Sequence, residues 1–220
     1  MAKRIGVILS GCGYLDGAEI HEATITLLAL DRGGAEIKMM APNKSQMHVI
    51  NHKSGDVTGE VRNVLTESAR IARGEVVDIA EVKADDLDGI ILPGGYGAAK
   101  NLTDFAVKGA DCTIHPEVDR LLNDMFKAKK PIGVICIAPA VLARALKGKD
   151  VKVKLTIGND KDTAAALEAM GAQHVECKVD DTVVDEEHKV VSTPAYMLGP
   201  GIKDVATGIE KLVAKALELA

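Results

Sequence analysis

Short, continuously apolar runs alternate along this chain with longer segments in which apolar residues recur at helical spacing. The apolar runs are clearest at residues 4–9, 87–92 and 132–135, which read RIGVIL, LDGIIL and IGVI. Strands that are apolar at nearly every position must be covered on both faces, which is typical of parallel sheets between layers of helices. The alternation therefore predicts an α/β fold with a mostly parallel central sheet and helices on both faces.

The remaining segments complete this pattern. Helical spacing predicts helices at residues 18–31, 61–73, 115–127, 139–147, 163–170 and 202–219. Short extended runs predict further strands at residues 36–41, 76–79, 151–157, 175–179, 182–184 and 190–192. The chain shows no internal repeat, low-complexity segment or shift in composition, so we expect a single domain over residues 1–220.

Composition argues against several function classes. The net charge is −5 and no Lys/Arg stripe appears, so we expect neither nucleic acid nor an anionic membrane as a partner. No apolar run approaches the roughly 20 residues of a membrane helix, and the N-terminus reads as a first strand, so a cytoplasmic protein is expected. Aromatic residues make up only 2% and Trp is absent, which argues against base-stacking platforms and aromatic cages.

The four cysteines, Cys12, Cys112, Cys136 and Cys177, lie far apart and form no CxxC pair. This spacing excludes zinc-ribbon and thioredoxin-type sites, and it predicts no metal centre. In a protein of this length without an export signal, free thiols are expected rather than disulfides.

Cys136 occupies a junction between a predicted strand and a predicted helix. The strand Ile132–Ile135 ends directly before it, and Pro139 fits the first turn of the following helix. The positive end of a helix dipole stabilises a thiolate, so this position favours a nucleophilic cysteine. A small buried thiol with only a packing role is the alternative.

Two other predicted strand ends carry glycine-rich turns. In SGCGYLDGAEIHEA, residues 10–23, the glycine spacing does not match a dinucleotide-binding loop. In PGGYG, residues 93–97, adjacent glycines expose backbone N–H groups that can bind an anion or oxyanion. Ligands of parallel α/β folds bind at the carboxyl ends of strands, so these turns and Cys136 are expected to lie together.

The segments PGGYGAAKNL, VICIAPA and DGAEIHEA resemble the ThiJ/PfpI superfamily of class I glutamine-amidotransferase-like proteins. Longer segments, among them VILSGCGYLDGAEIHEA and INHKSGDVTGEVRNVLTESARIARG, resemble its ElbB branch, also called sigma cross-reacting or enhancing lycopene biosynthesis proteins. The resemblance runs from about residue 5 to the C-terminal helix. It implies a flavodoxin-like three-layer sandwich and, as in most of the superfamily, a homodimer.

The resemblance also assigns roles to residues. It implies that Cys136 is the nucleophile, that Glu22 is its acidic partner, and that Gly94, Gly95 and the N–H of Ile137 line an oxyanion hole. Proteases of the superfamily carry His directly after the cysteine, where this chain has Ile137. That departure, with no histidine placed by a recognisable motif, argues against protease and amidase activity.

The resulting hypothesis is a glyoxalase without glutathione, metal or organic cofactor that converts glyoxal or a similar small dicarbonyl to a hydroxy acid such as glycolate. The ElbB resemblance also implies a link to isoprenoid biosynthesis. A cysteine-based redox or stress sensor and a non-catalytic binding module are the alternatives. Further residues are candidates for the rim or wall of the pocket: Cys12, His21, Asn51, Arg62 and Tyr196.

Overall fold

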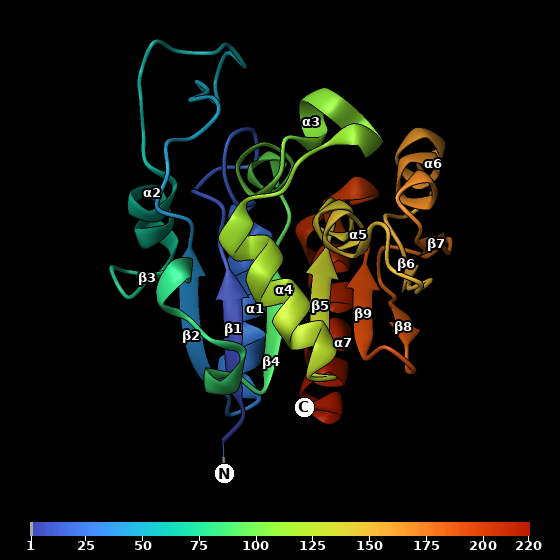
Figure 1. The fold of residues 1–220 in the computed structure, drawn as a ribbon. Helices are drawn as coiled ribbons and strands as arrows, with labels where there is room; N and C mark the ends of the chain where they lie inside the picture. The colour runs from blue at the N-terminus through green and yellow to red at the C-terminus, as the bar shows by residue number, and fades with distance from the viewer. Residues whose placement is uncertain (1) are drawn as a thin grey trace.

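The structure of the protein is a computed structural model that describes residues 2–220 (Figure 1). A seven-stranded sheet forms its centre, in the order β3-β2-β1-β4-β5-β9-β8, and only the β8–β9 pair is antiparallel among its pairs. The strands are β1 (Arg4–Ile8), β2 (Glu36–Ala41), β3 (Val77–Asp78), β4 (Gly89–Leu92), β5 (Ile132–Ile135), β8 (Val183–Asp185) and β9 (Val190–Thr193). The predicted mostly parallel, flavodoxin-like sheet is confirmed.

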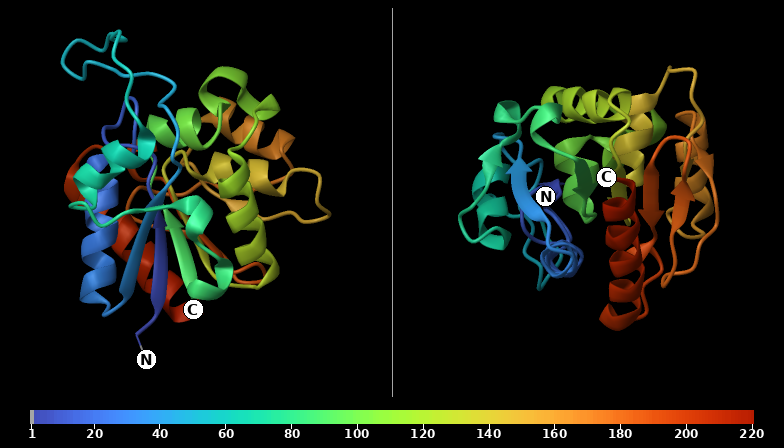
Figure 2. Two further views of the ribbon diagram at one scale, coloured as in Figure 1. Left: turned by 60° about the vertical axis from the view of Figure 1, so that its left-hand side comes forward. Right: turned by 90° about the horizontal axis from the view of Figure 1, so that it is seen from below.

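Helices cover both faces of this sheet, as Figure 2 shows from two further directions. One layer holds α1 (Ile20–Arg32), α2 (Val64–Ile71) and α7 (Ile202–Leu219), and the other holds α4 (Pro116–Lys127), α5 (Pro139–Leu146) and α6 (Lys161–Ala169). Within residues 2–220, no helix has both the length and the apolar character to cross a bilayer.

The continuous apolar runs are explained by a hydrophobic core on each side of the sheet. In β4, Ile90 and Leu92 pack in one core and Ile91 packs in the other. All three side chains are at most 1% exposed. Successive strand residues point to opposite faces, so burial of both faces requires apolar residues at every position.

Several predicted elements differ from those observed. The strand predicted at 151–157 is reduced to β6 (Lys154–Leu155), which pairs with β7 (Gln173–His174) in a separate two-stranded sheet, and residues 175–179 are not a strand. A π-helical turn, η3 (Ala98–Leu102), and a short helix, α3 (Phe105–Lys108), were not predicted. Short apolar runs predict extended backbone, but a strand also needs a neighbour with which to pair, and that neighbour is set by the fold.

The carboxyl ends of β1, β4, β5 and β9 meet at one edge of the sheet, where α3 also lies (Figure 1). Residues 43–63, here called the strap, extend beyond this edge as a long loop (Figures 1 and 2). Isolated bridges between Ile50 and Val57 and between Ser45 and Asn63 fold the strap back on itself. The sheet edge under the strap is where a ligand is expected in a parallel α/β fold.

Candidate active site

Cys136 lies directly after β5 in a strained backbone conformation. Its φ is +59°, in the left-handed region that non-glycine residues rarely occupy. The Cys136 N–H donates to the Thr193 carbonyl oxygen at 3.0 Å, which ties the turn to the end of β9. The side chain is 7% exposed, and α5 begins three residues later at Pro139. Strain of this kind is maintained by the surrounding structure and clusters at functional sites.

Glu22, in the first turn of α1, is fully buried beside this cysteine. Its Oε2 accepts a hydrogen bond from the Gly94 N–H at 2.8 Å, and its Oε1 accepts one from the Tyr196 N–H at 3.3 Å. A third hydrogen bond joins the carboxyl group to the Cys136 thiol. Among residues 2–220, Glu22 has no cationic partner, so this acid is held by dipoles alone.

The environment of Glu22 favours its protonated form. Burial, and next the neighbouring Glu19 carboxylate, raise the pKa of Glu22 to about 8, against the lowering effect of its hydrogen bonds. At neutral pH the carboxyl group therefore stays protonated and can donate a hydrogen bond to the sulfur.

The Cys136 thiol is subject to opposing influences. Burial, and next the Glu22 carboxylate, raise its pKa, whereas hydrogen bonds from the N–H groups of Gly95 and Ile137 lower it. Repulsion from Glu22 exists only while that residue is ionised. Once Glu22 holds the proton, the repulsion is replaced by a hydrogen bond to the sulfur, and a thiolate there has three donors.

The two glycines after β4 allow the chain to pass close to this pair. A Cβ atom at Gly94 would lie 2.5 Å from the Cys136 Cβ and 2.8 Å from the Glu22 Oε2. Gly95 has a φ of +89°, and a Cβ there would lie 2.4 Å from the Glu19 backbone nitrogen. Any side chain at either position would separate the PGGYG turn from Glu22 and the sulfur.

A cavity of about 440 Å³ opens beside the sulfur. Four of the residues predicted for the site line it: Gly95, Cys136, Ile137 and Tyr196. The other walls include Glu19 and four side chains that sequence analysis did not select: Tyr14, Tyr96, Phe105 and Met197. Tyr14 and Tyr96 lie within the two glycine-rich turns, so their position beside strand ends was the signal that could have identified them.

Three of the predicted residues adjoin the cavity without lining it. Glu22 is one of them, fully buried and hydrogen-bonded to the Cys136 thiol that does line the cavity. The Gly94 N–H, expected in the oxyanion hole, donates to Glu22, so the N–H groups that face the sulfur are those of Gly95 and Ile137. His21 lies on the exposed side of Tyr196, where its Nδ1 is 2.8 Å from the tyrosine hydroxyl oxygen.

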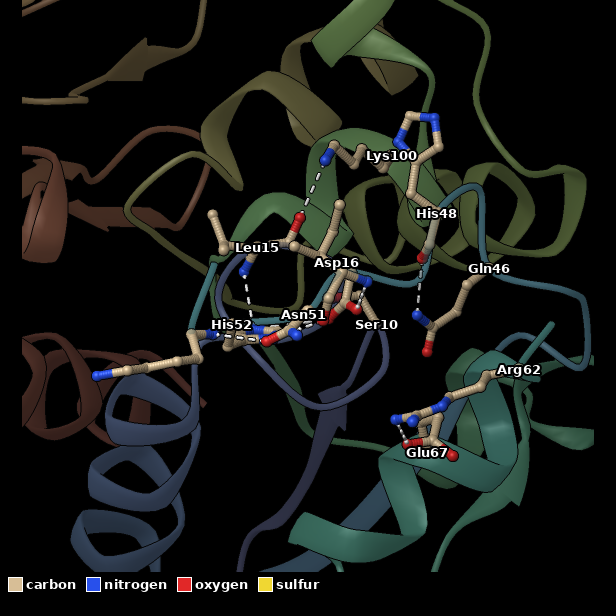
Figure 3. Close-up of polar contacts among 12 residues, drawn as sticks. Ser10, Leu15, Asp16, Gln46, His48, Asn51, His52, Arg62, Glu67 and Lys100 are labelled. Atoms are coloured by element: carbon tan, nitrogen blue, oxygen red, sulfur yellow. Dashed lines mark hydrogen bonds and ion pairs between the residues drawn. The ribbon is translucent and has the colours of Figure 1, made fainter. Parts of the chain in front are cut away.

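Three other candidates lie outside the cavity wall. Arg62 forms an ion pair with the buried Glu67 at 3.5 Å (Figure 3). Asn51 is exposed in the strap, and its Oδ1 accepts a hydrogen bond from the Lys53 N–H at 3.0 Å. Cys12 is half-buried, and burial raises the pKa of its thiol. The turn and strap bring these residues to the same edge of the sheet but not into the pocket.

The site offers a nucleophile and a proton donor but no metal centre. All four cysteines are free, and residues 2–220 contain no group of three His, Cys, Asp or Glu side chains arranged to hold a metal. A buried thiol paired with a neutral carboxyl group can add to an electrophilic carbon and move a proton.

Known proteins resemble this chain over almost its whole length. The human protein "Glutamine amidotransferase-like class 1 domain-containing protein 3, mitochondrial" is 47% identical over 228 residues, which cover 99% of this chain and 84% of the human protein. The crystal structure of an isoprenoid biosynthesis protein with an amidotransferase-like domain from Ehrlichia chaffeensis is 40% identical, covers 99% of this chain and 100% of that chain, and superimposes with a TM-score of 0.92. Drosophila melanogaster DJ-1beta, 22% identical with a TM-score of 0.58 over 100% of this chain and 96% of its own, shares the fold.

These similarities revise one expectation and establish the family. The human relative is named as mitochondrial, which does not fit a plain cytoplasmic expectation. The sequence model of the DJ-1/PfpI family matches residues 12–196, which include both Glu22 and Cys136. The chain therefore belongs to the DJ-1/PfpI family.

Proposed function

We propose that this protein is a cofactor-free glyoxalase-type enzyme that converts glyoxal or a similar dicarbonyl compound to a hydroxy acid. The observation that carries the proposal is the Cys136–Glu22 pair: a strained, buried thiol is hydrogen-bonded to a carboxyl group with a pKa of about 8, and the thiol lines a cavity. Glu22 can act as an acid and as a base near neutral pH, and such a group is needed to move a proton between two carbon atoms.

The first step starts from the form of the site in which Glu22 is protonated and Cys136 is a thiolate, and the sulfur adds to one carbonyl carbon. A C–S bond forms, and the carbonyl oxygen takes the proton of Glu22, which leaves a hemithioacetal and a Glu22 carboxylate. The N–H groups of Gly95 and Ile137 stabilise negative charge at this end of the cavity.

The second step is an internal redox reaction. The Glu22 carboxylate removes the hydrogen of the hemithioacetal carbon and returns a proton to the neighbouring carbon, so that the first carbon is oxidised and the second reduced. The product is a thioester of the hydroxy acid, and water releases glycolate and the thiol. The sequence needs no external oxidant or reductant.

The finer assignment to the ElbB branch is part of this proposal. It is supported by the sequence resemblance and by the name of the Ehrlichia protein, which links that relative to isoprenoid biosynthesis. We propose the same physiological setting for this chain, and a homodimer as its assembly.

The decisive experiment compares glycolate formation from glyoxal by the wild type and by Cys136→Ala. We expect at least a ~10³-fold loss, because the variant has no nucleophile. Cys112→Ala is a matched control, since Cys112 is a second buried cysteine that does not line the cavity. Equal turnover by wild type and Cys136→Ala would refute the mechanism. If neither forms glycolate while dilute peroxide selectively oxidises Cys136, the redox-sensor alternative is favoured.

A further inference from the structure

We infer that the substrate of this site is a bulky, apolar carbonyl compound without negative charge, for which an aryl-substituted α-ketoaldehyde is the fitting class. The inference rests on the proposed function and specifies its substrate. Four observations carry it: the location of the aromatic residues, the way they are held, the size of the cavity and its charge.

Aromatic residues are concentrated at this one place. The chain has only three Tyr, two Phe and no Trp. All three tyrosines and one phenylalanine line the cavity: Tyr14, Tyr96, Phe105 and Tyr196. In a chain so poor in aromatic residues, this gathering is a specific feature of the site. Aromatic faces and edges contribute large apolar contact area to a bound ring.

Two of these tyrosines are held from outside the cavity by polar side chains. The Tyr196 hydroxyl oxygen lies 2.8 Å from the His21 Nδ1, and the Lys100 ammonium lies 5.1 Å from the centre of the Tyr96 ring. Tyr196 is also fixed through its main chain, because its N–H donates to Glu22. Tyr196 is thus held at both its hydroxyl group and its main chain before a ligand enters, which favours binding of a rigid, bulky group.

Tyr14 is held through the strap and its own neighbour. Its ring meets the His52 ring edge-on at 5.5 Å between centroids. The next residue, Leu15, is tied at both ends: its N–H donates to the His52 Nε2 at 3.3 Å, and its carbonyl oxygen accepts from Lys100 at 2.9 Å (Figure 3). The strap therefore positions a wall of the cavity.

The size of the cavity exceeds what glyoxal needs. A volume of about 440 Å³ lies within the 300–1,000 Å³ of pockets that enclose drug-sized ligands, whereas glyoxal has four non-hydrogen atoms. Much of the lining is apolar, and it includes Ala99, Phe105, Ile137 and Met197. A ketoaldehyde that carries a ring fills this space and replaces water at an apolar surface.

The charge of the lining argues against acidic substrates. Glu19 is the one charged residue that lines the cavity in the part of the chain described, and its Oε2 accepts the Glu22 N–H at 2.7 Å. Within residues 2–220, no Lys or Arg side chain lines it to balance a substrate carboxylate or phosphate. An anion would lose hydration and face a like charge, so selection against anions is built into the wall.

Phenylglyoxal is the probe for this class. The Cys136 sulfur adds to its aldehyde carbon, and Glu22 moves the hydrogen of that carbon to the former ketone carbon. The aldehyde carbon is oxidised to the level of an acid, the ketone carbon is reduced to an alcohol, and addition of one water molecule releases mandelate. Atoms and electrons balance without a further reactant.

The experiment compares kcat/KM for glyoxal, phenylglyoxal and 4-carboxyphenylglyoxal with the full chain. We expect phenylglyoxal to exceed glyoxal by about tenfold or more, and the carboxylated analogue to fall about tenfold or more below phenylglyoxal. In Glu19→Gln the ratio between phenylglyoxal and its carboxylated analogue should shrink, and in Tyr96→Ala the ratio between phenylglyoxal and glyoxal should shrink. Equal or higher kcat/KM for glyoxal in the wild type, or full tolerance of the carboxylate, would overturn the inference.

A binding measurement separates this inference from the proposed chemistry. Cys136→Ala is titrated by calorimetry with acetophenone and with 4-acetylbenzoate, which cannot react there. Saturable binding of acetophenone alone supports the inference even if no dicarbonyl is turned over, in which case only the proposed function fails. Turnover of glyoxal without binding of acetophenone would leave the function intact and reject the substrate class.

Discussion

Two buried carboxyl groups of this protein have opposite properties. Glu22 is fully buried beside Cys136 with two backbone N–H groups and a thiol as partners, and burial raises its pKa to about 8. Asp185, at the end of β8, is 4% exposed and accepts hydrogen bonds from the Lys154 N–H at 2.8 Å and from the His188 ring at 3.0 Å. These partners hold the pKa of Asp185 below its usual value, although burial acts in the other direction.

The difference lies in the partners rather than in the depth of burial. The His188 ring and main-chain donors stabilise the ionised form of Asp185. These hydrogen bonds connect the end of β8 to Lys154 and to the turn before β9. Glu22 has main-chain donors but a neighbouring acid, Glu19, instead of a base. At neutral pH the Asp185 carboxyl group is therefore ionised, whereas that of Glu22 is protonated.

The largest expected effect that tests this contrast comes from Glu22→Gln. The amide cannot give or take the migrating proton, so kcat for dicarbonyl turnover should fall roughly 10²-fold or more. Wild-type activity should decline as pH rises through about 8, where Glu22 loses its proton, and the variant should lack that limb. The measurement is the pH–rate profile, with Asp185→Asn as the control for replacement of a buried acid by an amide. An alkaline limb retained in Glu22→Gln would assign it to another group.

Gly94→Ala should reduce turnover less than Glu22→Gln does. It tests the main-chain N–H that donates to the Glu22 carboxyl group. The added methyl group would meet the Cys136 Cβ and the Glu22 Oε2 at under 3 Å, so the turn must move and the Gly94 hydrogen bond must lengthen. We expect a loss of about 1–3 kcal/mol in the free energy of unfolding, as for other overpacked cores, together with reduced turnover.

The control is Gly59→Ala in the strap, where a Cβ atom meets nothing within 4 Å. Both variants are compared by urea denaturation and by kcat/KM. Equal stability and equal turnover of Gly94→Ala and Gly59→Ala would mean that the close approach of the PGGYG turn to Glu22 is not required.

Asp185→Asn should have the smallest effect on activity, but it should clearly lower the free energy of unfolding. Loss of hydrogen bonds to a charged group should lower the free energy of unfolding by about 1.5–3 kcal/mol near neutral pH, with kcat/KM unchanged because Asp185 does not line the cavity. The folded-state pKa of Asp185 is lowered, so its contribution is present at neutral pH and is lost as pH falls through that pKa. The free energy of unfolding of the variant, measured by urea denaturation, should therefore depend less on pH in the acid range than that of the wild type.

Glu22 should affect the free energy of unfolding in the alkaline range instead. Its folded-state pKa of about 8 lies above its ordinary value of 4.5, so its contribution is complete below pH 4.5 and is lost as pH rises through about 8. The comparison is made in Cys136→Ala, where no thiol shares the proton: adding Glu22→Gln should flatten the alkaline limb of the urea-denaturation profile. If both acids changed the same limb, the contrast between them would be wrong.

Local sequence predicted the parts of the site that depend on neighbours along the chain. The junction of β5, Cys136 and Pro139 was recognisable because a strand-length run and a helix start adjoin the cysteine. The PGGYG turn was recognisable for the same reason. The N-cap of α1 was less evident, because Glu19 rather than a Ser, Thr, Asp or Asn side chain accepts the Glu22 N–H.

Two residues chosen because they lie in long family-like segments do not line the cavity. Arg62 and Asn51 lie in a characteristic polar segment, but Arg62 pairs with Glu67 of α2 and Asn51 accepts a hydrogen bond from within the strap. Low aromatic content argued against base-stacking platforms and aromatic cages, and it did not indicate that four of the five aromatic residues would share one cavity. Composition measures how many such residues exist and says nothing about where the fold brings them.

The sequence by itself determined the layered, parallel architecture and the position of Cys136 between a strand and a helix, because apolar runs and a strand–helix junction are encoded within short windows of the chain. Only the tertiary structure decided that Glu22 meets Gly94, 72 positions away, and Tyr196, 174 positions away, with no cationic partner among residues 2–220. Those contacts arise where the parallel strands end together. They set the dielectric surroundings and hydrogen bonds of the carboxyl group, and these govern where its proton lies.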